Sequence, residues 1–251
     1  MALTLGVSLK AYLGYHQTLS WAAAVGEAIA GHRLDLELFV LPSYPALAEV
    51  SRILAGTGVN LGAQNLATDD SGAQTGEVTG AMLVELGCRY VAVGHAERRS
   101  RFGESDDVVA AKIAAAFRHS LTPVLCVGET DHRTATKAIP ECIRQVNSAL
   151  TVAHRTGTVG RVVVAYEPIW AIGQAKPAPD EHILAVIEGI RGVADGSSVI
   201  YGGSAQPGLL SRLADGVDGL FLGRFAHDPV ALAAVVGEAE ALTANANRAA
   251  L

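Results

Sequence analysis

The chain has 251 residues, of which 50% are hydrophobic, and its formal net charge is −6. About 250 residues suffice for one large core, and this is the usual size of an α/β barrel. The acidic balance, without a cluster of Lys and Arg, argues against a nucleic-acid partner. No apolar stretch approaches the roughly 20 residues of a membrane-spanning helix, and the N-terminus lacks a signal-peptide pattern.

The chain contains three cysteines, Cys88, Cys126 and Cys142. Their number is odd and none of them has CxxC spacing, so we interpret them as reduced thiols of a cytoplasmic protein. Cys126 lies inside an apolar run and is expected in the core.

Short apolar runs alternate with amphipathic stretches along the whole chain. The predicted strands cover residues 3–8, 36–41, 59–65, 89–94, 122–127, 161–166, 198–201 and 217–222. The predicted helices cover residues 17–30, 45–54, 78–86, 106–118, 133–154, 179–193, 207–214 and 229–242. The tail that follows the last helix is expected to fray.

Eight strand–helix pairs, with no linker between them, predict a parallel sheet with helices outside it. Eight units at this length favour a closed barrel over an open doubly wound sheet. We therefore expect residues 1–251 to form a single (β/α)8 barrel domain, with functional residues at the carboxyl ends of the strands.

The stretch 162–173 is the most informative part of the sequence. A continuously apolar strand ends at Glu167, and Pro168 follows at once. A carboxylate at the end of a buried strand can have a raised pKa and act as a general base. The apolar segment that follows, ending in Gly173, is interpreted as a lid. The alternative is a buried strand, a turn and an incidental glutamate.

Polar residues also follow the other predicted strands. Lys10 follows the first strand, and His95 is the only one of the eight histidines that directly follows a strand. The run Glu97-Arg98-Arg99 is interpreted as a network that supports His95 and Lys10, although it could be a solvated helix start.

Glycine-rich turns follow the last two strands, at Gly202-Gly203-Ser204 and at Gly223. The loops after strands seven and eight of a barrel frequently bind phosphate, because glycine lets backbone N–H groups approach the anion.

Five short motifs occur together in this chain. They are residues 75–77 (TGE), 94–99 (GHAERR), 126–129 (CVGE), 165–173 (AYEPIWAIG) and 201–204 (YGGS). In this combination, and nearly from end to end, the sequence resembles the triosephosphate isomerases, which are TIM barrels. The family is itself the standard example of a glutamate base paired with a neutral histidine under a closing loop.

The resemblance implies an aldose–ketose isomerase with no metal or organic cofactor. Glu167 would move a proton between the two carbons that flank the carbonyl group, and neutral His95 would donate to the enediolate oxygens. Lys10 would stabilise the negative charge, with Glu97 and Cys126 in support. A small phosphorylated sugar would be the substrate, and the lid, residues 168–178, would keep water from the enediolate.

The resemblance also implies which groups hold the phosphate. They are the backbone amides of Gly173, Ser204, Gly223 and Arg224. The loop that carries Thr75 and Glu77 is implied to insert into a second subunit of a homodimer, where Glu77 could pair with Arg98 of the partner subunit. The alternative is an exposed polar loop.

Two departures from the family pattern bear on the substrate. Ser8 stands where the family has a larger asparagine, and Arg224 replaces the second glycine of a pair. Ser8 frees space near the reacting carbons, and Arg224 brings a guanidinium towards the phosphate. Other departures are Gln74, Ala96 and the lid residues 174–177.

These departures leave three functions open. The first is the glycolytic and gluconeogenic interconversion of glyceraldehyde 3-phosphate and dihydroxyacetone phosphate, with Arg224 pointing to solvent. The second is the isomerisation of a phosphorylated ketotetrose such as an erythrulose phosphate. The third is a non-catalytic phosphosugar-binding relative, against which the joint retention of Lys10, His95 and Glu167 argues.

Overall fold

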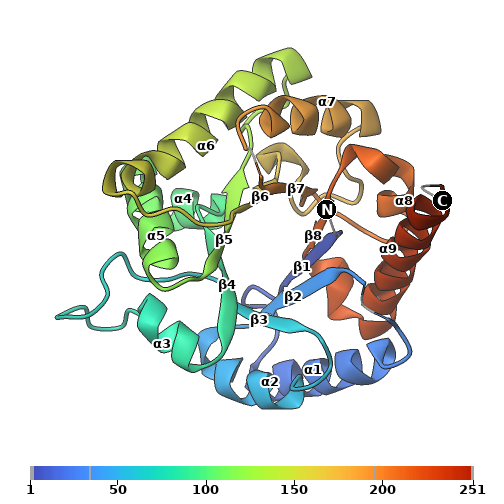
Figure 1. The fold of residues 1–251 in the computed structure, drawn as a ribbon, viewed down its shortest axis with the longest axis horizontal. Helices are drawn as coiled ribbons and strands as arrows, with labels where there is room; N and C mark the ends of the chain where they lie inside the picture. The colour runs from blue at the N-terminus through green and yellow to red at the C-terminus, as the bar shows by residue number, and fades with distance from the viewer. Residues whose placement is uncertain (1–2, 34, 195, 250–251) are drawn as a thin grey trace.

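The computed structural model describes residues 3–33, 35–194 and 196–249. Eight parallel strands form a closed barrel in sequence order, and the helices surround it (Figure 1). This confirms the predicted (β/α)8 barrel. The strands are β1 (Thr4–Ser8), β2 (Glu37–Leu41), β3 (Asn60–Ala63), β4 (Cys88–Val93), β5 (Thr122–Val127), β6 (Val163–Tyr166), β7 (Ser198–Tyr201) and β8 (Gly219–Leu222).

The outer layer consists of α-helices and short 3-10 helices. The α-helices are α1 (Tyr15–Ile29), α2 (Leu47–Ile53), α3 (Gly80–Glu85), α4 (Ala96–Phe102), α5 (Asp106–Arg118), α6 (Ala135–Thr156), α7 (Asp180–Arg191), α8 (Leu209–Leu213) and α9 (Pro229–Ala249). The 3-10 helices are η1 (Tyr44–Ala46), η2 (Ile169–Ala171), η3 (Ala214–Gly216) and η4 (Arg224–His227).

The hydrophobic core has two parts, one between the strands and the helices and one inside the barrel. Inside the barrel, Phe39 stacks on Tyr90 with ring centroids 4.3 Å apart. Glycine makes room for these rings, because a Cβ atom at Gly6 would lie 2.3 Å from Cζ of Phe39. The filled interior leaves only the ends of the barrel available for a ligand.

Two parts of the structure differ from the sequence prediction. Residues 96–102 form the short helix α4, although only a charged turn or helix start was expected there. The final helix α9 continues to Ala249, so the expected fraying directly after residue 242 was wrong. The alanines of this tail have high helix propensity, which favours continuation of the helix.

The seam between β8 and β1 closes the barrel, and it depends on a glycine. Gly219 pairs with Thr4 and has a φ of +147°. A Cβ atom at this position would lie 1.8 Å from the carbonyl oxygen of Thr4. The three nearest atoms all belong to the Thr4 backbone, so no side chain can move aside and the seam tolerates only glycine.

We expect Gly219→Ala to lower the free energy of unfolding by about 3 kcal/mol or more, because the new methyl group forces the two strands apart. Urea denaturation followed by circular dichroism measures this change. Gly31→Ala is the matched control, since a Cβ atom at Gly31 meets no atom within 4 Å. Equal stability of the two variants would contradict the close approach at the seam.

Candidate active site

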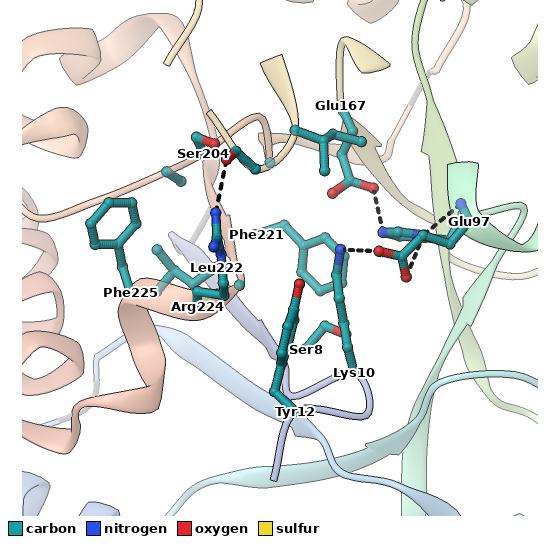
Figure 2. A pocket seen from close by; sticks show the side chains of 16 residues that line it. Ser8, Lys10, Tyr12, Glu97, Glu167, Ser204, Phe221, Leu222, Arg224 and Phe225 are labelled. Atoms are coloured by element: carbon teal, nitrogen blue, oxygen red, sulfur yellow. Dashed lines mark hydrogen bonds and ion pairs between the residues drawn. The ribbon is translucent and has the colours of Figure 1, made fainter. Parts of the chain in front are cut away.

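A cavity of about 220 Å³ opens at the carboxyl ends of the strands. Figure 2 shows that side chains from several strand ends surround it, among them Lys10, Glu167 and Arg224. The predicted site residues that line it are Ser8, Lys10, His95, Glu97, Glu167, Gly173, Ser204, Gly223 and Arg224. The structure therefore brings together the strand ends that the sequence analysis singled out.

Glu167 follows β6, and its side chain is buried beside His95. The backbone N–H of Glu167 donates to the carbonyl of Val127, which fixes the residue to the end of β5. Its Oε2 atom is buried without a hydrogen-bond partner in the described part of the chain and lies 3.6 Å from Nε2 of His95. A buried carboxylate oxygen without a partner is costly, so this atom is poised to interact with a ligand.

Close packing of two glycines sets the position of this carboxylate. A Cβ atom at Gly202 would lie 2.6 Å from Cγ of Glu167, and one at Gly128 would lie 2.1 Å from the Glu167 carbonyl oxygen. The end of β7 and the segment after β5 thus approach Glu167 more closely than any other residue type would allow.

His95 is the N-cap residue of α4 and is 7% exposed. The backbone N–H of Glu97 donates to Nδ1 of His95 over 3.1 Å. Because Nδ1 accepts this hydrogen bond, the ring proton belongs on Nε2, which is buried without a partner among the described residues. The neutral ring therefore offers an N–H donor on the same side as Oε2 of Glu167.

Lys10 follows β1, and its backbone has a left-handed conformation with a φ of +50°. Gln64 donates to its carbonyl over 2.9 Å, and Nζ of Lys10 donates to Oε1 of Glu97 over 2.8 Å. Burial acts to raise the pKa of Glu97, but the hydrogen bond and charge of Lys10 outweigh it, so this pKa is lowered. Glu97 thus stays ionised at neutral pH and anchors the ammonium group. A non-glycine residue with this φ is uncommon and fits a functional position.

Comparison with known proteins agrees with this geometry. The sequence profile of triosephosphate isomerase matches residues 3–239. The chain belongs to the triosephosphate isomerase family. It is 51% identical to L-erythrulose-1-phosphate isomerase of Pectobacterium atrosepticum, over 97% of this chain and 98% of that protein. It is 42% identical to triosephosphate isomerase of Magnetococcus marinus, over 80% of this chain and 84% of that protein. It is 38% identical to L-erythrulose-1-phosphate isomerase of Rhizobium etli, over 90% of this chain and 88% of that protein.

Membership of the triosephosphate isomerase family makes this protein an isomerase. The segment 168–178, which the sequence analysis interprets as a lid, borders the cavity through Ile172 and Gly173. Three hydrogen bonds join this segment to residues at the ends of β7 and β8. Ser204 Oγ donates to the carbonyl of Ala171 over 2.8 Å, and Nη2 of Arg224 donates to the carbonyl of Gly173 over 2.8 Å. The N–H of Ala178 donates to Oη of Tyr201 over 3.0 Å.

The first part of the lid is held by Glu129, which is 1% exposed. Its carboxylate accepts a hydrogen bond from Trp170 Nε1 over 2.7 Å and from the Tyr166 hydroxyl over 3.1 Å. The ring of His132 packs edge-on against Trp170. Glu129 and His132 therefore hold Trp170 at the start of the predicted lid.

Other predicted site residues lie around the cavity rather than in it. Cys126 lines a neighbouring cavity together with Glu167, and burial followed by the Glu167 charge raises the pKa of its thiol well above the usual value. All three cysteines are free and buried. The sequence analysis missed Tyr12 and Phe221, which line the main cavity. Tyr12 lies two residues after Lys10, and this closeness was the available signal.

The predicted dimer loop lies between β3 and α3. Thr75 and Glu77 are exposed on it, and it projects from the barrel (Figure 1). In the single chain Arg98 pairs with Glu104. The pairing of Glu77 with Arg98 of the partner subunit stays a prediction. No helix in the described residues is long and apolar enough to span a membrane.

We expect Gly202→Ala to lower the kcat of the isomerase about 100-fold, because the new methyl group displaces the Glu167 carboxylate by about 1 Å. Steady-state kinetics with a saturating sugar phosphate measures the change, and a thermal melt confirms that the barrel is intact. Gly192→Ala is the matched control, since its Cβ would come no nearer than 3.6 Å to any atom considered. Wild-type kcat in Gly202→Ala would contradict the packing argument.

Proposed function

We propose that this protein isomerises an erythrulose that carries its phosphate on carbon 1. Relatives named L-erythrulose-1-phosphate isomerase support this substrate, because one of them shares 51% identity over 97% of the chain. The relative named triosephosphate isomerase from Magnetococcus marinus shares 42% identity over 80% of the chain. Both substrates are small phosphorylated sugars, and both need the same kind of proton transfer.

The proposed reaction moves one proton between neighbouring carbons. Glu167 takes the proton from carbon 3, a double bond forms between carbons 2 and 3, and the carbonyl oxygen on carbon 2 gains the negative charge. The Nε2–H group of His95 and the ammonium of Lys10 stabilise this enediolate. A proton then passes from the hydroxyl on carbon 3 to the oxygen on carbon 2, and return of a proton to carbon 2 leaves the carbonyl on carbon 3. Numbered from its other end, this product is an erythrulose 4-phosphate. With a triose phosphate the same transfer gives an aldose.

The presence of Ser8 in the cavity is the observation that favours a tetrose phosphate over a triose phosphate as the substrate. The proposed substrate is dihydroxyacetone phosphate with a hydroxymethyl group in place of one hydrogen on the carbon that loses its proton. Ser8 ends β1 and lines the same cavity as His95 and Glu167. Its hydroxyl has no hydrogen-bond partner in the described part of the chain, so it can receive the extra hydroxyl of the substrate.

The opposite end of the cavity is proposed to hold the phosphate. Gly173, Ser204, Gly223 and Arg224 meet there from the lid and from the ends of β7 and β8. Backbone N–H groups of glycine-rich turns and a guanidinium are suited to a phosphate dianion. The free cysteines support a cytoplasmic location, and the projecting loop with Thr75 supports a homodimer.

The second candidate is the glycolytic triosephosphate reaction. The relatives named triosephosphate isomerase favour it, and Lys10, His95 and Glu167 serve both substrates equally well. The two candidates differ at Ser8, where the triose needs neither the space nor the hydroxyl.

The test compares kcat/KM for L-erythrulose 1-phosphate and dihydroxyacetone phosphate in the wild type and in Ser8→Asn. We expect the wild type to prefer the tetrose by about 10-fold or more. Ser8→Asn fills the space, so kcat/KM for the tetrose should fall about 100-fold while that for the triose changes little.

Ser8→Ala is the control for this experiment, because it keeps the space and removes only the hydroxyl. It should retain more tetrose activity than Ser8→Asn. A wild-type preference for the triose by about 10-fold would reject the tetrose and leave the glycolytic reaction as the function.

A further inference from the structure

Arg224 lies between the predicted lid and the proposed phosphate site. It begins η4, directly after β8 and Gly223. The backbone of η4 is anchored, because Trp21 Nε1 of α1 donates to the carbonyl of Ala226 over 2.9 Å and Ala226 is 1% exposed. Figure 2 shows the Arg224 side chain extending along the cavity wall towards Ser204. The backbone of the short helix that carries Arg224 is therefore anchored to α1.

One N–H group of the Arg224 guanidinium donates to the lid, and its other N–H groups have no partner among the described residues. Nη2 of Arg224 donates to the carbonyl of Gly173 over 2.8 Å. Its Nε and Nη1 atoms make no hydrogen bond to the described residues, and no carboxylate of those residues lies within salt-bridge distance. An arginine carries five N–H donors in a fixed fork, so it can hold the lid carbonyl and a phosphate oxygen pair at the same time.

The charges that line the cavity point to the same role. Lys10 is paired with Glu97 over 2.8 Å, and His95 presents a neutral ring. Arg224 is consequently the one cation without an acidic partner among the described lining residues. A phosphate dianion needs a countercharge when it leaves water, and Arg224 supplies it at the end of the cavity away from Lys10.

We propose that Arg224 is a positioning residue that couples phosphate binding to closure of the lid, and so selects phosphorylated substrates. This inference rests on the proposed phosphosugar substrate. A phosphate held by one N–H of Nη2 together with the N–H of Nε or Nη1 orients the guanidinium, and the other N–H of Nη2 donates to the Gly173 carbonyl. The coupling is reciprocal, because a closed lid keeps Arg224 in place for the phosphate.

Inorganic phosphate tests this coupling without any turnover, and the chain supplies its own reporter. It has two tryptophans, of which Trp170 belongs to the lid and Trp21 is buried against η4. Titration with phosphate should give a saturable change in tryptophan fluorescence, and Trp170→Phe assigns that signal to the lid.

We expect Arg224→Gln to raise the Kd for inorganic phosphate about 10- to 100-fold, as expected for loss of a charged hydrogen bond, and to reduce the fluorescence change at saturation. Arg224→Lys keeps the charge without the fork, so it should recover part of the affinity but not the full fluorescence change. Arg155→Gln on the exposed face of α6 removes the same charge and should match the wild type.

Wild-type affinity in Arg224→Gln would overturn the phosphate contact. A full fluorescence change in Arg224→Gln or Arg224→Lys at saturating phosphate would overturn the coupling to the lid. Failure of the proposed function is separate from both outcomes, because it appears as missing turnover of L-erythrulose 1-phosphate while the phosphate titration is unaffected.

Discussion

The hydrogen bond from the backbone N–H of Glu97 to Nδ1 of His95 determines what the active site can do. The same bond caps α4, which has no buried residues of its own. A helix with so little packing depends strongly on its cap. Local structure and chemistry are therefore linked, since the interaction that starts the helix also places the ring proton on Nε2, facing Glu167.

Charge pairing divides the cavity into two ends with different tasks. At one end Lys10 and Glu97 neutralise each other, and the buried carboxylate of Glu167 lies beside a neutral donor. At the other end Arg224 remains without an acidic partner among the described residues and touches the lid. An anionic group is favoured at the second end, which leaves the proton-transfer chemistry to the first. The proposals on Ser8 and Arg224 concern these two ends separately, so either can fail without the other.

Much of the fold could be predicted because strand and helix periodicity is a local property. The bounds of β5, β7 and α5 were predicted to the residue, since apolar runs and turn residues mark both ends. The helix α4 was missed because it has no apolar face. The site residues at the strand ends were found because a barrel brings these ends together whatever the loops do.

The remaining features depend on tertiary contacts that a sequence does not contain. The contact between Arg224 and Gly173 joins residues 51 positions apart through a long side chain, and the sequence does not reveal where such a side chain points. The exposed Tyr12 reaches the cavity only because the backbone turns at Lys10 with a positive φ. The resemblance to a family indicated the kind of chemistry, but the specific contacts of this chain became visible only in three dimensions.

The protonation of His95 is the most direct test of this account, and ¹⁵N nuclear magnetic resonance measures it. Comparison of the spectra of the wild type and His95→Gln assigns the ring signals among the eight histidines. At neutral pH we predict a neutral His95 ring with its proton on Nε2 and an unprotonated Nδ1 that accepts from Glu97. A proton on Nδ1, alone or together with one on Nε2, would contradict the account.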